Sequence, residues 1–333
     1  KPERTDSWEV GLDMKLFKDF NLGLSWYLAN TFNQTFDPQI SVSSGYTTIY
    51  LQTGYVRNTG LELSLGYGHT WNNNFRWDSN FTLSHNKNKI KELVRDYVHP
   101  ETGELINKDR LDVGGLGKAR FILKEGGTLG DLYTQSDLKR DDNGMVDIDP
   151  TGIVAIENNL PDIKLGSVFP KANLAWSNHF SWKGISLSAL FTARIGGIVY
   201  SATEAAMDQY GVSERSALAR DNGGVLVNNR TLVDAQNYYT TIGSESGLPQ
   251  YYTYNATNVR LQEASIGYLI PRKWLGNVCD IQVSVIGRNL WMIYNKAPFD
   301  PESVATTDNY YQGIDYFMLP STRNIGFNVK INF

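Results

Sequence analysis

This chain of 333 residues has a single cysteine, no long apolar run and little excess charge of either sign. Cys279 cannot form a disulfide within the chain, so internal cross-links do not hold the fold together. The formal net charge of -4 leaves no broad basic surface, which argues against a nucleic-acid partner. No stretch of about 18 apolar residues is present, so the sequence predicts no transmembrane helix.

The start of the chain lacks a targeting signal. Lys1-Pro2-Glu3-Arg4 is charged and is followed by no apolar segment of the kind that a signal peptide needs. We therefore expect either a mature chain that begins here or one part of a longer protein. The mean hydropathy of -0.35 does not argue against a membrane. A membrane β-barrel alternates apolar and polar residues and is therefore hydrophilic on average.

Alternation of apolar and polar residues recurs along most of the chain and is clearest in residues 323–333, where Ile325, Phe327 and Val329 share one parity with Ile331 and Phe333. A strand places alternate side chains on opposite faces, so each such segment predicts a strand with one apolar face. We count about eleven, and no long amphipathic helix beyond a short one within 203–220. The predicted strands cover residues 8–16, 20–28, 61–67, 75–83, 119–124, 129–138, 174–182, 185–195, 258–269, 281–288 and 324–333.

The connections between these strands are alternately short and long, if the hairpin at 119–138 is counted in. In an up-and-down antiparallel barrel, this pattern places every short turn at one end, as in outer-membrane barrels. The parity of the apolar residues changes within 258–269, which predicts a β-bulge there. The short connections are 18–19, 72–74, 125–127, 183–184 and 275–277, and the long ones are 30–57, 88–118, 139–170, 200–256 and 292–322.

Aromatic residues gather at the short turns. Trp71, Trp182 and Trp274 each precede one, while Phe17 and Phe20 flank another. Such rings prefer the headgroup level of a bilayer, so this row predicts a periplasmic girdle; the alternative is that they cap the core of a soluble protein. A barrel with about eleven strands would have open edges in lipid. We therefore expect that strands are missing on the N-terminal side.

Several short motifs, taken in order, resemble the C-terminal part of a SusC-like (SusC/RagA family) TonB-dependent outer-membrane transporter of the Bacteroidetes type. Each motif alone is weak, but together they extend over the whole sequence. The motifs are Lys1-Pro2-Glu3-Arg4-Thr5, Asn58-Thr59-Gly60-Leu61-Glu62, Asn258-Val259-Arg260-Leu261 with Ile266-Gly267-Tyr268, Gly287-Arg288-Asn289-Leu290 (Arg for the usual Gln), Asp300-Pro301-Glu302, and Pro320-Ser321-Thr322-Arg323 before a last strand that ends at Phe333.

This resemblance implies an all-β, antiparallel transmembrane β-barrel of 22 strands, of which residues 1–333 would supply about eleven as the C-terminal half. The plug, the segment that contacts TonB and the N-terminal strands would be absent from this sequence. The family imports glycans or oligopeptides across the outer membrane, together with a SusD-like surface lipoprotein. By the same resemblance, Phe333 is the signal that the outer-membrane assembly machinery reads in the lipid-facing last strand.

No constellation in the sequence indicates an enzyme or a cofactor. The four histidines, His69, His85, His99 and His179, are far apart and form no zinc motif. Asp141 and Asn143 lie in a segment that resembles part of a calcium loop, although the twelve-residue register is missing. The alternative is a solvated acidic turn in an extracellular loop.

Tyrosines in the long connections are the candidate substrate contacts, because their rings can stack on sugars or pack against peptide side chains. The alternative is that they pack the loops together or against a partner. Arg76, Arg194 and Arg288 have the polar parity and could line a pore or pair with acids. The candidate tyrosines are Tyr238, Tyr239, Tyr251, Tyr252, Tyr310 and Tyr311, with Tyr254 nearby.

Two other classes of protein remain open on the sequence. A soluble all-β carbohydrate-active enzyme or lectin would bury the apolar faces and carry a cleft with paired carboxylates. A passive porin would need neither a plug nor TonB.

Overall fold

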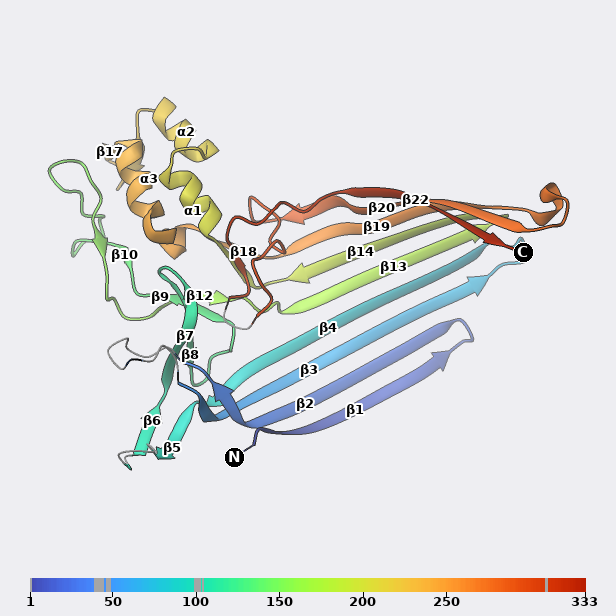
Figure 1. The fold of residues 1–333 in the computed structure, drawn as a ribbon, viewed down its shortest axis with the longest axis horizontal. Helices are drawn as coiled ribbons and strands as arrows, with labels where there is room; N and C mark the ends of the chain where they lie inside the picture. Colours follow the sequence, from blue (N-terminus) through green and yellow to red (C-terminus); the bar gives the residue numbers. More distant parts are fainter. Residues whose placement is uncertain (1, 39–44, 46–48, 99–102, 104, 309–310) are drawn as a thin grey trace.

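The computed structural model describes residues 2–38, 45, 49–98, 103, 105–308 and 311–333 of the chain. Its main element is a nine-stranded sheet in which every neighbouring pair is antiparallel (Figure 1). The prediction of an all-β, antiparallel fold is therefore confirmed. In sheet order, the strands are β1 (Arg4–Leu16), β2 (Phe20–Phe36), β3 (Leu51–Thr70), β4 (Arg76–Glu92), β13 (Ala172–Trp182), β14 (Ile185–Ile195), β19 (Asn258–Ile270), β20 (Asp280–Asn295) and β22 (Asn324–Asn332).

The register extends the alternation of each strand across the whole sheet. One row of cross-strand neighbours is polar over most of its length. A second row, three residues nearer the turn end and on the opposite face, is apolar throughout. The polar row is Gly11, Ser25, Glu62, Ser84, Asn173, Arg194 and Asn258. The apolar row is Met14, Leu22, Leu65, Phe81, Trp176, Phe191, Leu261 and Trp291.

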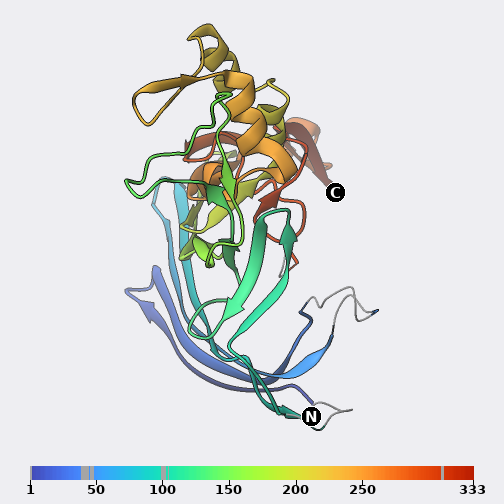
Figure 2. The ribbon, with the colours of Figure 1, turned by 90° about the vertical axis from the view of Figure 1, so that its left-hand side faces the viewer.

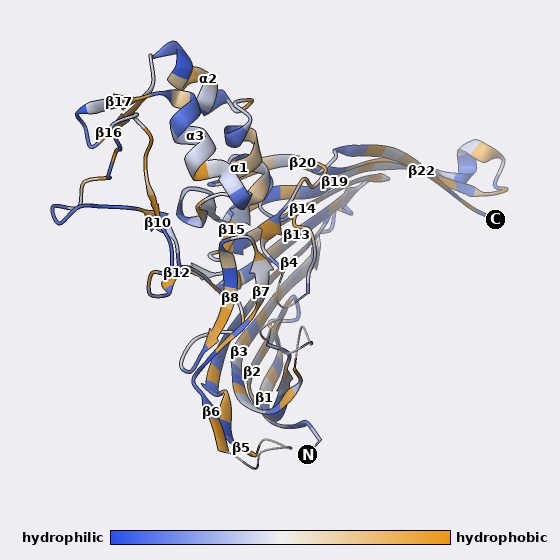
Figure 3. Ribbon diagram, turned by 60° about the vertical axis from the view of Figure 1, so that its left-hand side comes forward, coloured by the Kyte–Doolittle hydropathy of each residue, from blue (hydrophilic) through white to orange (hydrophobic). Residues whose placement is uncertain are grey.

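The sheet is curved, as Figure 2 shows from the end that carries the long connections. The polar rows line its hollow side, where residues from seven strands surround a cavity. On the other side, large apolar residues are exposed, including Leu187 at 47%, Ile266 at 56% and Phe327 at 83%. Figure 3 shows the resulting alternation of hydrophilic and hydrophobic residues along the strands. Such a surface suits a hydrocarbon solvent on one side and water on the other.

The predicted hairpin at 119–138 is not part of this sheet, so the count of eleven strands is wrong. Its strands β8 (Ala119–Lys124) and β9 (Asp131–Thr134) join β7 (Arg110–Leu116) and β12 (Ile163–Ser167) in a separate four-stranded sheet. The physical reason is visible in β8, where Phe121, Ile122 and Leu123 are all fully buried. Three consecutive apolar residues indicate a strand covered on both faces, whereas a barrel wall needs alternation.

With nine strands, the alternation of short and long connections still holds. The turns at 17–19, 71–75, 183–184 and 271–279 lie at one end, and the connections 37–50, 93–171, 196–257 and 296–323 lie at the other (Figure 1). The turn at Phe17 and Lys18 has positive φ at both residues, 49° and 66°, as tight hairpins between twisted strands require. Nine is also an odd number, so β1 and β22 run in the same direction.

The predicted bulge lies at Gln262. The registers of β19 with both β14 and β20 shift at this residue, which has no cross-strand partner between Leu261 and Glu263. The shift moves the apolar side chains of β19 from one parity to the other without changing the face on which they lie. The prediction from the mixed alternation is confirmed.

The aromatic residues at the turn end form a contiguous band. The ring of Tyr67 lies 4.7 Å from that of Phe20 and 5.1 Å from that of Trp77, which in turn lies 5.9 Å from Phe180. The predicted girdle residues lie at this end and are exposed, from Trp71 at 38% to Phe17 at 87%. Their placement agrees with an interfacial girdle.

The long connections fold together into a layer over the other end of the sheet (Figure 1). The buried core lies where this layer meets the ends of the wall strands: Phe121, Tyr200 and Leu248 of the layer and Phe36 and Ile90 of β2 and β4 are all at 0% exposure. Of the helices in the described ranges, none is long and apolar enough to cross a membrane. Besides the four-stranded sheet, the layer contains β5 (Val94–Val98), β6 (Leu105–Lys108), β10 (Asp137–Leu138), β11 (Ile156–Glu157), β15 (Ile198–Ser201), α1 (Ala202–Gln209), α2 (Glu214–Asp221), β16 (Val225–Val227), β17 (Thr231–Val233), α3 (Ala235–Gly243), β18 (Thr253–Asn255), β21 (Ile314–Asp315) and short 3-10 helices at Ser244–Ser246 and Pro249–Tyr251. A further 3-10 helix, Arg272–Leu275, lies in a turn at the opposite end of the sheet.

Candidate functional site

The hollow face of the sheet carries a cavity of about 790 Å³. Its lining includes small polar and charged side chains, because the polar parity of each strand points to this side, together with leucines and alanines at the neighbouring positions. The charged residues in the lining are Glu9, Asp13, Glu62, Arg194 and Glu302, which makes the lining acidic. Glu9 accepts a hydrogen bond of 2.6 Å from Ser25, so its carboxylate is held in place.

A second polar depression of about 320 Å³ lies nearer the turn end of the same face, where Asp78, His179 and Glu263 contribute to its lining. The arginines expected to line a pore are on this face, and two of them pair with acids. Arg76 donates two hydrogen bonds to Asp78 at 2.6 and 2.7 Å. Arg288 donates a hydrogen bond to Glu263 at 2.8 Å.

The third predicted arginine, Arg194, is placed differently. Its guanidinium donates a 2.7 Å hydrogen bond to the carbonyl of Val168, which lies in the connection before β13. The side chain therefore ties the barrel wall to the loop layer while it contributes to the lining of the large cavity.

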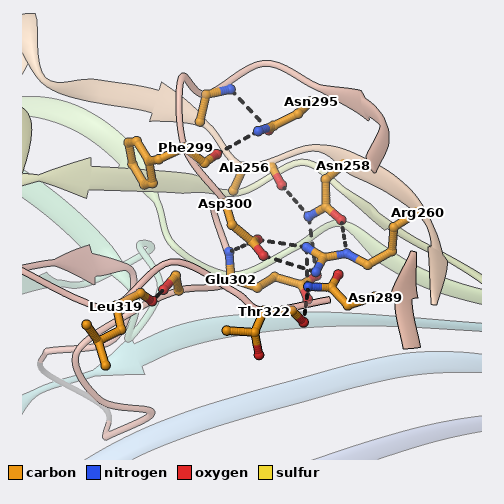
Figure 4. A network of polar contacts seen from close by, with 12 residues as sticks. Ala256, Asn258, Arg260, Asn289, Asn295, Phe299, Asp300, Glu302, Leu319 and Thr322 are labelled. Carbon is orange, nitrogen blue, oxygen red and sulfur yellow. Dashed lines mark hydrogen bonds and ion pairs between the residues drawn. The ribbon is translucent and has the colours of Figure 1, made fainter. Parts of the chain in front are cut away.

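The connection 296–323 is held to the wall by a buried ion pair (Figure 4). Arg260 of β19 donates hydrogen bonds of 2.8 and 3.2 Å to Asp300 and lies 3.3 Å from Glu302. Asn258 adds a hydrogen bond of 3.2 Å to Glu302. Burial alone would raise the pKa of Asp300, but the hydrogen bonds from Arg260 and from the Glu302 amide hold it below its usual range. Two motifs that are forty residues apart in the sequence are thus one contact in the structure.

The same connection has a second anchor at the helical part of the layer. Strand β21 pairs in parallel with β15, and Ser201 donates a 2.6 Å hydrogen bond to Asp315. The amide of Phe317 donates to the hydroxyl of Thr203 at 2.7 Å. Residues 296–323 therefore form a strap that is fixed at both the wall and the helices.

The motif at residues 58–62 also has a structural explanation. The ring of Tyr27, on the neighbouring strand, covers Gly60, and a Cβ at Gly60 would overlap that ring. Asn58 accepts hydrogen bonds from the side chains of Asn86 and Asn88 at 3.2 and 3.0 Å. The motif therefore joins three neighbouring strands near the loop end of the sheet.

The helices of the layer are organised around the carboxylate of Asp208, which is fully buried. It accepts hydrogen bonds from Ser213 at 2.6 Å, Arg215 at 2.8 Å and the Tyr252 hydroxyl at 2.9 Å. The Arg215 guanidinium lies 4.9 Å from the centre of the Tyr252 ring. Burial, and then the neighbouring Asp208, raise the pKa of Tyr252, so its hydroxyl remains a donor.

The structure places four of the candidate tyrosines in this layer. Tyr252 is at 0% exposure and lies inside the core, which agrees with the alternative that it packs the loops together. Tyr238, Tyr239 and Tyr251 are partly buried against the same core, and burial raises the pKa of Tyr238 to about 12. Their contact with a substrate stays a prediction.

The remaining candidate tyrosines are in the strap. Tyr311 is 42% exposed. Tyr310 lies outside the described residues.

The weak calcium candidate lies at a tight turn. Asp141 Oδ1 accepts hydrogen bonds from the amides of Asn143 and Met145, both at 2.9 Å, so backbone donors occupy it. Asp149 caps a second turn of the same kind eight residues later. Within the described ranges, no three His, Cys, Asp or Glu side chains come together as a metal site.

The small sheet of the layer carries an ion cluster that the sequence did not reveal. Asp162 accepts two hydrogen bonds from Arg110, at 2.7 and 2.9 Å, and lies 2.9 Å from Lys124. The hydrogen bonds from Arg110 lower the pKa of Asp162 to about 2, against the opposing effect of burial and with help from Lys124. Beside it, burial raises the pKa of Tyr133 to about 12.

Residues 1–116 match the family model described as "TonB dependent receptor-like, beta-barrel". TonB-dependent receptor P3 of Formosa agariphila is 25% identical over 364 residues, which cover 99% of this chain and 34% of that protein. TonB-dependent receptor P26 of the same organism is 24% identical over 99% of this chain and 34% of its own length. The chain therefore spans about a third of the length of these relatives.

Solved structures of the RagAB peptide importer have the same fold. In its closed-closed state the TM-score is 0.70 at 19% identity, with 99% of this chain and 35% of the other covered. The open-open state gives 0.68 at 17% identity, over 99% of this chain and 34% of the other.

A curved antiparallel sheet with a polar inner face, an apolar outer face and all its long loops at one end defines part of an outer-membrane β-barrel. The chain is similar to the β-barrel region of TonB-dependent receptors, by family model over residues 1–116 and by its relatives over nearly its whole length. Receptors of this family are outer-membrane proteins and are transporters rather than enzymes, which is in line with the prediction that the chain is not an enzyme.

Proposed function

We propose that this chain is the C-terminal part of the barrel of a SusC-like active importer, which takes up a large nutrient, either a glycan or an oligopeptide. The observation that carries the proposal is the polar inner face with its cavity of about 790 Å³ at the end covered by anchored loops. Water and a polar solute suit such a face, while the apolar outer face suits lipid.

The rest of the barrel and its plug would come from the other two thirds of a receptor of this size. The outer edges of β1 and β22 have no strand beside them among the described residues. A 22-stranded barrel needs roughly thirteen strands in addition to the nine found here. The edge strands β1 and β22 run in the same direction, and neighbouring strands in the barrel must alternate in direction. An odd number of further strands is therefore needed to join them.

We assign the energy source and the partner on the same basis. TonB would act through the N-terminal region, which the nine strands do not contain. A SusD-like surface lipoprotein would lie over the loop layer, in the outer membrane of a bacterium of the Bacteroidetes type. The similarity in fold to the RagAB importer supports a two-component arrangement.

Two other classes of protein account less well for the structure. A soluble sugar-binding protein would bury the outer rows, but Leu187, Ile266 and Phe327 are exposed along three strands. A passive porin would need no anchored loop layer over its mouth.

Uptake by the full-length protein tests the proposal. The gene, with its neighbouring lipoprotein gene, would be expressed in a strain with intact TonB and in a matched strain without it, and growth on candidate glycans and peptides would be compared. Growth that depends on both the receptor and TonB is expected. Receptor-dependent growth that persists without TonB would instead show a porin.

A further inference from the structure

We infer that a pocket among the three helices of the loop layer binds a single acidic sugar unit, a uronate, of a glycan. The pocket has a volume of about 290 Å³ and is formed by the end of α1 and the facing sides of α2 and α3, grouped together in Figure 1. That volume is at the lower end of ligand pockets, roughly 300 Å³, which suits a single sugar unit. The inference rests on the proposed function, since it names a substrate class for the same importer.

The walls of the pocket are fixed by polar contacts. Asp208 at the end of α1 accepts a hydrogen bond from Arg215 of α2, while the hydroxyl of Tyr239 in α3 donates to the Arg215 carbonyl at 3.4 Å. Arg220 donates a 2.9 Å hydrogen bond to the carbonyl of Gly211, which has a positive φ of 67°. The three helices therefore present a defined lining, with little reorganisation needed when a ligand binds.

The charge of the lining comes from one guanidinium. The Asp208 carboxylate is compensated by its ion pair with Arg215 at 2.8 Å. Arg220 is exposed and donates to a neutral carbonyl; it has no acidic partner within the described ranges. A guanidinium with spare N–H groups binds a carboxylate in a two-pronged geometry. The pocket thus favours a ligand that carries a carboxylate.

The remaining lining suits a sugar ring better than a peptide end. The side-chain amides of Gln209 and Gln236 have no hydrogen-bond partner in the described part of the chain, and each can both donate and accept, as hydroxyl groups require. Tyr239 lines the pocket and Tyr210 is 77% exposed beside it. Tyrosine rings offer an apolar face to a sugar and a hydroxyl at the edge. A uronate offers a carboxylate for Arg220, hydroxyl groups for the two glutamines and a ring face for the tyrosines in one sugar unit.

Calorimetry on the purified full-length receptor in detergent tests the inference, with a four-unit oligogalacturonate as the probe. Maltotetraose serves as the neutral sugar and trialanine as a peptide with a free carboxylate. We expect oligogalacturonate to bind, and Arg220→Gln to weaken that binding at least tenfold (about 1.4 kcal/mol). Gln236→Ala should weaken it several-fold. Arg230→Gln, which removes an exposed charge in the turn between β16 and β17, is the matched control and should bind as the wild type does.

Several outcomes would overturn the inference. These are no binding of oligogalacturonate, equal binding by Arg220→Gln, or binding of trialanine in its place. Hydrogen exchange of α1–α3 in each variant would show that the layer is still folded. If the pocket variants bind normally and uptake still depends on TonB, the pocket is rejected and the importer stands. If uptake occurs without TonB, the proposed importer itself is rejected.

Discussion

Arg260 and Asp300 form a two-pronged ion pair that joins the wall of the barrel to the connection above it, with side-chain exposures of only 6% and 10%. Removal of one partner would leave the other charge buried without compensation, which costs about 3–5 kcal/mol. We expect Asp300→Asn to release residues 296–303 locally, with hydrogen exchange there faster by roughly a hundredfold or more. Lys296→Gln removes an exposed charge in the same connection and should change nothing. Unchanged exchange in Asp300→Asn would show that the strap is held elsewhere.

The contact between Gly60 of β3 and Tyr27 of the neighbouring strand β2 leads to a second prediction, because the tyrosine ring covers the glycine. We expect Gly60→Ala to push the ring aside and to lower the free energy of unfolding by about 1–3 kcal/mol. In a Tyr27→Ala background the same substitution should cost less, since no ring is left to displace. Thermal unfolding, followed by the heat-dependent mobility of the barrel on gels, measures both effects. Additive losses in the double variant would rule out the contact as the cause.

The sequence predicted most of the barrel wall because alternation is a local signal. Each strand needs one apolar and one polar face, so residues such as Ile325 and Phe327 reveal both the strand and its orientation. Even the bulge at Gln262 is visible as a change of parity. The aromatic rows at the turns were visible for the same reason.

The loop layer could not be predicted in this way. Its strands β8 and β9 are buried on both faces, so β8 carries a run of apolar residues that any buried segment could show. The pairing of Arg260 with Asp300 depends on how a long connection folds back. Tyr252 appeared to be a candidate for substrate contact because it lies in a long connection, yet its hydroxyl is needed at the buried Asp208. These contacts depend on tertiary structure and leave no period in the sequence.

Asp162 should make the loop layer sensitive to acid. Its pKa in the folded protein is lowered to about 2, below the ordinary value of 3.8, so its ion pairs stabilise the layer fully above about pH 4. That contribution, about 1–2 kcal/mol after allowance for the half-exposed cations, is lost as the pH falls toward 2.

The corresponding experiment compares the wild type with Asp162→Asn. Hydrogen exchange of β7–β9, corrected for the intrinsic effect of pH, should show the variant less protected at pH 5 and equal to the wild type near pH 2. Asp142→Asn removes an exposed carboxylate of the layer and is the control. A deficit of the same size at both pH values would mean that the ionised carboxylate is not the source of the stability.

Phe333 remains a prediction as an assembly signal. It follows β22 at the edge of the sheet and is 89% exposed within the part of the barrel described. We expect deletion of Phe333 to reduce the amount of the full-length receptor in the outer membrane several-fold, while Phe333→Tyr keeps it near normal. Quantitative blotting of membrane fractions measures this. Normal levels after the deletion would contradict the role.

The most direct test of the account is the accessibility of alternate residues along β3 in the full-length receptor. In a Cys279→Ser background, cysteines would replace Glu62, Leu63, Ser64 and Leu65 one at a time, and intact outer membranes would be treated with a small charged thiol reagent. We expect positions 62 and 64, on the polar inner face, to react, while positions 63 and 65 are protected by lipid. Reaction at 63 and 65 instead, or at all four positions alike, would contradict a barrel wall with water on one side and lipid on the other.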